Sequence, residues 1–205
     1  MRVLRPIHAG LLALLSLGAC AEMQRPRVAA QPPAGLLPPM ADPVGGALAA
    51  TTSAFTDQGA GLRGRPAEAA RAAAQLEYLV DQAPAWTPVS PAAVIALAAA
   101  RAELRAAVGV PEAAPPRQAM VALTNAANAL ERRNQGAALA ALAPVGGEPT
   151  LRRLNDLGAL PNAEQATILL AREVARSEAE LRIGALQDVG DQRGDVLTEG
   201  LGRGF

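Results

Sequence analysis

Carboxylate side chains that could act as acid and base catalysts gather towards the C-terminal end of the chain. Glu173, Glu178 and Glu180 alternate there with arginines at spacings of three and four residues. A glycosidase needs just two such carboxyl groups, but the same alternation is typical of a solvated helix face that carries ion pairs. Glycan-cleaving enzymes also hold sugar rings on aromatic side chains, and only 2% of this chain is aromatic. The pattern therefore favours an ion-paired helix face over a cell-wall glycan hydrolase.

Most other catalytic and metal-binding chemistry is excluded by residue type. The chain has one histidine, His8, one cysteine, Cys20, and no lysine. With no histidine beyond residue 8, the bulk of the chain cannot build a serine–histidine triad or a histidine zinc site. The lack of lysine excludes a P-loop. We therefore expect no metal, no cofactor and no enzyme activity.

The overall charge excludes one class of partner. The 19 basic residues, all arginine, balance 19 acidic residues, so the formal net charge is zero. A nucleic-acid-binding protein needs a clustered excess of basic residues to contact phosphates. We therefore expect no nucleic-acid partner.

The N-terminus has the features of a secretory signal peptide. Arg2 and Arg5 precede an apolar stretch, IHAGLLALLSL, over residues 7–17. As a helix this stretch would span about 16 Å, against a hydrocarbon core of about 30 Å. It is therefore too short for a transmembrane anchor, and its charged flank fits a cleaved signal sequence.

The residues that follow this stretch carry a family resemblance. The sequence Leu17-Gly18-Ala19-Cys20 resembles the lipobox of bacterial lipoprotein precursors, although Gly18 is a less common choice at its position. The resemblance covers about the first 20 residues, and it implies cleavage between Ala19 and Cys20 and acyl chains on Cys20. Ala21 in place of an aspartate implies the outer membrane, where the cell has one. The alternative is an ordinary signal peptide that happens to end beside a cysteine.

Four segments are expected along the chain. A signal peptide (1–19) precedes a lipidated, proline-rich tether with a weakly ordered stretch (20–65). Prolines spread over residues 26–43 favour extended polyproline II, which holds a domain away from the bilayer. A helical domain follows (66–183). The glycine-rich end of the chain (184–205) shows no periodicity, and we predict that it is disordered.

Helix boundaries within the domain are marked by caps. Ser90 followed by Pro91 is typical of a helix start, and Gly109 of a helix end. Asn162 with Gln165 three residues later resembles a capping box. These signals and the apolar periodicity predict helices over residues 66–82, 91–108, 137–142, 149–157 and 162–183. A further helix is predicted to begin after Pro116.

The expected fold is all-α. No stretch has the period-two alternation of a strand, and alanine and leucine supply most of the apolar residues. Alanine favours helix but buries little area, so helices must approach closely. Short loops predict a small antiparallel bundle or a short array of helical hairpins, and the bundle is favoured because no repeat near 34 residues is present.

The chain's one tyrosine, Tyr78, and one tryptophan, Trp86, lie close in sequence. We expect Trp86 to cover the core beneath a proline-rich loop and Tyr78 to pack at its rim. The alternative is that both contact a partner, because these residue types are enriched at binding hot spots. Two arginine pairs, 132–133 and 152–153, either complement helix dipoles or contact anionic lipid or peptidoglycan.

Together these features predict a lipid-anchored cell-envelope protein on the periplasmic side, acting as a non-catalytic structural or protein-interaction module. Its partners would be the membrane, through the acyl chains on Cys20, and an envelope protein or peptidoglycan. A carrier of a hydrophobic ligand and a glycan hydrolase stay open as alternatives. An exposed apolar patch beside Trp86 would favour interaction, an enclosed apolar cavity would favour the carrier, and a cleft between two carboxylates would favour the hydrolase.

Overall fold

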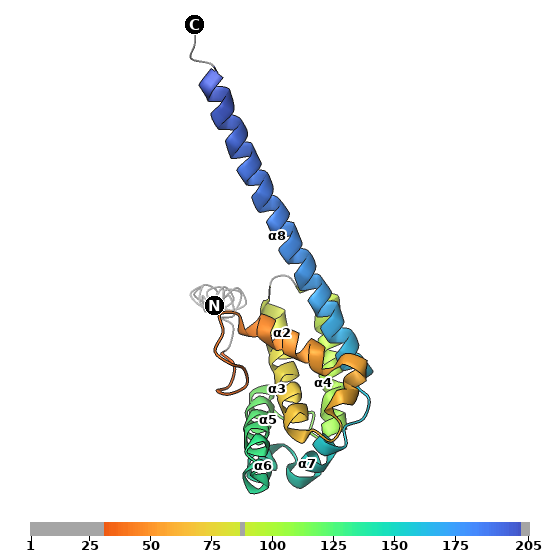
Figure 1. Ribbon diagram of the computed structural model, residues 1–205. Helices are drawn as coiled ribbons and strands as arrows, with labels where there is room; N and C mark the ends of the chain where they lie inside the picture. Colours follow the sequence, from red (N-terminus) through yellow and green to blue (C-terminus); the bar gives the residue numbers. More distant parts are fainter. Residues whose placement is uncertain (1–30, 87–88, 202–205) are drawn as a thin grey trace, which may run out of the picture. The chain divides into compact units, whose positions relative to one another are not determined.

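The part of the chain that the structure describes contains helices and no strands, so the all-α prediction is confirmed (Figure 1). The structure is a computed structural model that describes residues 31–86 and 89–201, with side-chain exposure up to residue 184. Ala19, Cys20 and the predicted signal peptide lie outside the described residues, and lipidation stays a prediction.

The helices follow one another through short connections. In chain order they are α2 (Pro43–Ala54), the 3-10 segment η1 (Thr56–Leu62), α3 (Pro66–Gln82), the 3-10 turn η2 (Ala83–Ala85), α4 (Pro91–Val108), α5 (Pro116–Glu131), α6 (Gln135–Leu142), the 3-10 turn η3 (Ala143–Val145), α7 (Gly147–Asn155) and α8 (Pro161–Leu201).

Local capping signals explain where α4 begins and ends. The Ser90 hydroxyl accepts a hydrogen bond from the backbone N–H of Ala93 at 3.2 Å, as an N-cap does. At the other end Gly109 adopts a left-handed φ of 76°, and the N–H groups of Gly109 and Val110 both donate to the carbonyl of Arg105. Glycine occupies this conformation without a steric penalty, so the predicted start and stop are both confirmed.

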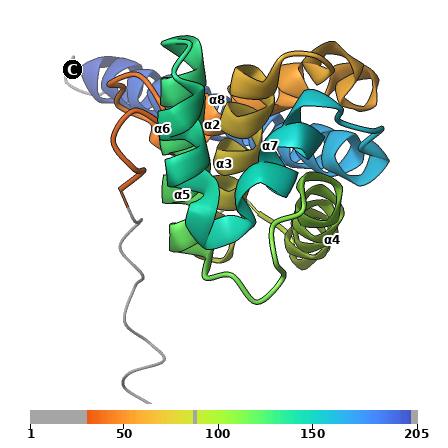
Figure 2. The same cartoon turned by 90° about the horizontal axis from the view of Figure 1, so that it is seen from below.

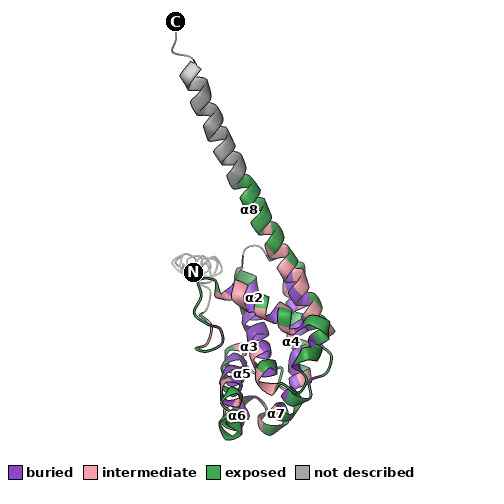
Figure 3. Ribbon diagram, viewed as in Figure 1, coloured by how far each residue is buried: buried purple, intermediate pink, exposed green. Residues whose placement is uncertain are grey.

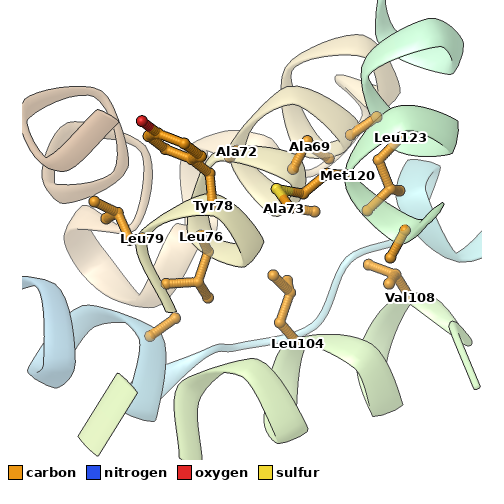
Figure 4. Packing of buried hydrophobic residues seen from close by; sticks show 14 of the residues in the cluster. Ala69, Ala72, Ala73, Leu76, Tyr78, Leu79, Leu104, Val108, Met120 and Leu123 are labelled. Carbon is orange, nitrogen blue, oxygen red and sulfur yellow. The ribbon is translucent and has the colours of Figure 1, made fainter. Parts of the chain in front are cut away.

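Helix α3 lies at the centre of the bundle and contacts α2, α4, α5 and α7 (Figure 2). Its alanines are buried on several sides, which lets neighbouring helices approach closely. Larger side chains fill the space between α3, α4 and α5 (Figure 4): Leu76, Leu104, Val108, Met120 and Leu123. Each such buried side chain stabilises the fold by about 1.5–3 kcal/mol.

A buried ion pair fastens α3 to α4. Both carboxylate oxygens of Glu77 accept hydrogen bonds from the guanidinium of Arg105, and the two side chains are 1% and 6% exposed. Arg105 also donates to the backbone carbonyls of Glu112 and Ala114, at 2.7 and 2.9 Å. One side chain therefore satisfies a buried charge and holds the α4–α5 loop.

The folded part of the chain begins well before residue 66, which corrects the predicted tether. Leu36 and Phe55 are fully buried, and Leu62 is 4% exposed. Helix α2 starts at Asp42, whose side chain accepts a hydrogen bond from the N–H of Gly45 at 2.9 Å. The last of the prolines around residue 40, Pro43, lies in the first turn of α2 and does not prevent the helix, because proline is favoured at that position.

Helix α8 continues to Leu201, so the prediction of a disordered tail from residue 184 is wrong as far as that residue. Its glycines are isolated, and no proline follows Pro161. Each glycine costs about 1 kcal/mol in a helix but does not stop it. Leu181 is 72% exposed, and the stretch of α8 over residues 178–184 is exposed throughout (Figure 3).

The N-terminus of α8 is capped from another helix rather than by the predicted capping box. Asn162 lies inside the first turn, and its backbone N–H donates to Glu103 of α4 at 3.2 Å. The backbone N–H of Ala163 donates to the other carboxylate oxygen of Glu103 at 3.1 Å. A carboxylate at this position also complements the helix dipole.

Candidate functional site

A groove of about 880 Å³ runs between α2 and α8. Its apolar lining includes Leu48 and Ala49 from α2 and Ala171, Val174, Ala175 and Leu181 from α8, with Trp86 from the connection between α3 and α4. The lower part of α8 lies beside α2 in Figure 1. The groove therefore joins residues that are far apart in sequence, and it is open to solvent rather than enclosed.

Trp86 reaches this groove because α3 ends in the short turn η2. The backbone N–H of Trp86 donates to the carbonyl of Ala83 at 3.2 Å, and the backbone of Trp86 then becomes extended. Its side chain packs against the core but is only half-buried. Trp86 therefore covers core residues, as expected, and it also lines an accessible groove. Contact with a partner stays a prediction.

Tyr78 does not lie at a rim or face a partner, because it is only 1% exposed. Helix α3 is covered on most sides, so a position that an amphipathic pattern places near the edge is enclosed. The side chain points away from Leu104 and Leu123 (Figure 4), and its hydroxyl has no hydrogen-bond partner among the described residues. Burial raises the pKa of Tyr78, and the negative charges of Asp42 and Asp81 raise it further.

The polar groups of the groove are hydroxyls and two carboxylates. Thr52, Ser53, Thr56 and Ser177 contribute the hydroxyls, and Asp42 and Glu178 contribute the carboxylates. Asp42 also caps α2 through its bond to Gly45. Among the described side chains that line this groove, these two carboxylates are the charged groups, so its lining is acidic. Two carboxylates in a cleft are what the hydrolase alternative requires, but Asp42 is engaged as the cap of α2, which makes it a poor partner in an acid–base pair.

The glutamates of α8 separate into different surroundings. Glu173 accepts a hydrogen bond from the Ser90 hydroxyl at 2.6 Å and another from the Ser90 N–H at 2.9 Å. These bonds, the hydroxyl first, lower the pKa of Glu173, and Arg176 contributes in the same direction. Glu178 lines the groove, whereas Glu173 and Glu180 both border a separate shallow hollow with Arg176. Glu173 thus holds the start of α4, with Arg176 beside it on the same face of α8.

The two arginine pairs border two hollows on another part of the surface. Arg133 lines one of about 470 Å³, and Arg152 and Arg153 line one of about 700 Å³. Acidic side chains line both hollows too, and Arg152 forms an ion pair with Glu148 at 2.7 Å. Positive and negative groups are therefore mixed, which gives an anionic lipid or glycan little net attraction there.

The contribution of α2 to the groove was missed at the level of sequence. Asp42 followed by Pro43 is the same start signal as Ser90 followed by Pro91, and it could have located this helix. The glycines and threonines of α2 give it a weak amphipathic pattern, so its buried face was not predicted. The contact between α2 and α8 is part of the tertiary structure, and a local sequence pattern cannot predict it.

Over the ranges 31–86 and 89–201, no group of three or more His, Cys, Asp or Glu side chains could hold a metal ion. Nor does any helix within those ranges have the length and apolar character needed to cross a bilayer. Comparisons with models of protein families, with curated protein sequences and with solved structures found no match.

Proposed function

We propose that this chain is a lipid-anchored cell-envelope protein whose helical bundle binds an envelope partner without catalysing a reaction. The observation that carries this proposal is the α2–α8 groove beside Trp86. An exposed apolar surface on a bundle whose core is filled marks an interaction site. Tryptophan is also among the residues most enriched at binding hot spots.

The proposed anchor limits where the partner can lie. Acyl chains on Cys20 would hold the chain durably, since each buried methylene contributes about 0.8 kcal/mol. Because Leu36 is packed into the core, the tether is shorter than the sequence predicts and ends near residue 35. A fully extended stretch from Cys20 to that point would reach about 50 Å. The partner is therefore expected near the membrane surface.

Site-specific crosslinking in intact cells tests the interaction. A photo-crosslinking residue at Ala175, which is exposed in the groove, should yield a discrete product. The same residue at Ala140, exposed on α6, is the control, and Ala99 on the exposed face of α4 tests a competing surface. Ala49→Gln, which fills the groove, should reduce the Ala175 product, whereas Ala140→Gln should not.

Two outcomes would refute the interaction. One is that Ala175 gives no product beyond that of Ala140. The other is that the product comes from Ala99 and is insensitive to Ala49→Gln, since the partner would then occupy α4.

The anchor has its own test. Cells fed a fatty-acid analogue should label the wild-type chain and not the Cys20→Ala variant, and the label should fractionate with outer membranes. Unlabelled wild-type chain, or chain that retains residues 1–19, would contradict lipidation and leave the groove proposal to stand on its crosslinks.

A carrier of a hydrophobic ligand is the second candidate, and the groove volume favours it. About 880 Å³ lies within the range of 300–1,000 Å³ that is typical of small-molecule sites. Against it, the groove is open and has hydroxyls among its lining groups. Native mass spectrometry and organic extraction of the chain purified from membranes decide this point, because a carrier would retain stoichiometric lipid that Ala49→Gln reduces.

A further inference from the structure

The charges of the α2–α8 groove identify the chemistry of its occupant. Asp42 stands at the start of α2, and Glu178 lies on the wall formed by α8. Within the described part of the chain, neither carboxylate forms an ion pair. Asp42 and Asp81 both act on the buried hydroxyl of Tyr78, so negative charge is concentrated at the α2 end. Arg182, one helical turn beyond Glu178, is not part of the lining.

The apolar part of the groove suits a helix. Two helices form its walls, and side chains of a third helix can pack between such walls in the manner of ridges and grooves. Leu181 on the α8 wall is 72% exposed and Trp86 is half-buried, so both have apolar surface left for an occupant to cover. The hydroxyl of Ser177 adds a polar contact at the lining.

We propose that the groove binds a basic amphipathic helix of another envelope protein, with leucine-like side chains against Trp86 and arginine or lysine side chains beside Asp42 and Glu178. This inference rests on the proposed function, because it names the partner class for the same groove. An anionic lipid fits less well, since the carboxylates of the lining would repel its headgroup.

The test uses the full mature chain and two synthetic peptides of about 18 residues, or five helical turns. Both peptides carry leucines at the i, i+3, i+4 and i+7 positions, and they differ only in bearing arginine or glutamate on the polar face. Trp86 is the chain's one tryptophan, so its fluorescence reports groove occupancy directly. The arginine peptide should bind at least fivefold more tightly than the glutamate peptide, and this preference should decline as salt screens the charges.

Charge-neutral variants assign the preference to the groove. Asp42→Asn with Glu178→Gln should weaken the arginine peptide about fivefold, the change that two exposed ion pairs produce. Asparagine also caps helices, so α2 is retained, and Glu178→Gln alone should give part of the effect without touching a cap. Glu112→Gln with Glu148→Gln removes the same charge from exposed sites elsewhere and should leave binding unchanged.

The inference is overturned if both peptides bind equally, if neither changes Trp86 fluorescence, or if both pairs of variants weaken binding alike. Vesicles with anionic lipid that change the fluorescence when the arginine peptide does not would assign the groove to a lipid instead. If the Ala175 crosslink in cells persists while the peptides show no charge preference, the proposed function stands and only the partner class is refuted.

Discussion

Removing one partner of the buried Glu77–Arg105 pair should be among the most damaging single changes to this fold. Glu77→Met leaves a guanidinium that is almost wholly buried without its counter-charge, which costs about 3–5 kcal/mol. Arg105→Met leaves the carboxylate unpaired and also removes the donor to two loop carbonyls. We expect a loss at the upper end of that range, a large part of the 5–15 kcal/mol that stabilises a typical domain.

Urea denaturation followed by far-ultraviolet circular dichroism measures these losses on the Cys20→Ala chain. The double variant Glu77→Met with Arg105→Met should be less destabilised than the sum of the single variants by about 2 kcal/mol or more, because neither charge then remains buried alone. The reasoning is refuted if Glu77→Met costs less than about 1 kcal/mol, or if the two losses simply add.

Three further changes probe Leu36, Gly109 and Glu173. Leu36→Ala should cost about 2–5 kcal/mol in urea denaturation because it opens a cavity in the core, whereas Leu181→Ala, at an exposed site, should cost less than about 0.5 kcal/mol. Gly109→Ala, where φ is positive, should lower the thermal stability by about 1–2 kcal/mol, and Gly61→Ala, where a Cβ meets open space, should not. Glu173 has a lowered pKa in the folded chain. Its hydrogen bonds therefore stabilise the fold at pH values above the unfolded pKa, and this contribution is lost as the pH falls through the folded pKa. Glu173→Gln should accordingly reduce the acid sensitivity of unfolding.

Each of these predictions has an outcome that contradicts it. A neutral Leu36→Ala would return that residue to the tether, and equal effects of the two glycine substitutions would remove the conformational argument. An unchanged dependence of stability on pH in Glu173→Gln, measured between about pH 3 and 7, would mean that its bonds to the start of α4 contribute nothing.

Much of the helical domain could be predicted because its boundaries are encoded locally. Pro66, Ser90 with Pro91, and Gly109 act through the conformations of one or two residues. Such signals need no knowledge of the rest of the chain. The buried positions Leu97, Leu104 and Val108 of α4 recur at helical spacing, so this face too is defined by periodicity alone.

The features that were missed depend on residues far apart in sequence. Glu77 and Arg105 are 28 residues apart, and nothing in the sequence marks them as partners. Glu103 caps α8 through Asn162, which lies 59 residues later. The groove likewise requires α2 and α8 to meet, which no local pattern encodes. Tertiary packing decided these points against local propensity.

The contacts of the 3-10 segment η1 have a consequence for how the chain matures. Its Gln58 carbonyl accepts from Leu160, and its Asp57 N–H donates to Glu164, so an early part of the chain is completed by a late one. While the ribosome is still making residues before α8, the partners of η1 do not exist. Pairings over such separations slow folding. The segment η1 can therefore reach its final packing only after residues 160–164 have been synthesised.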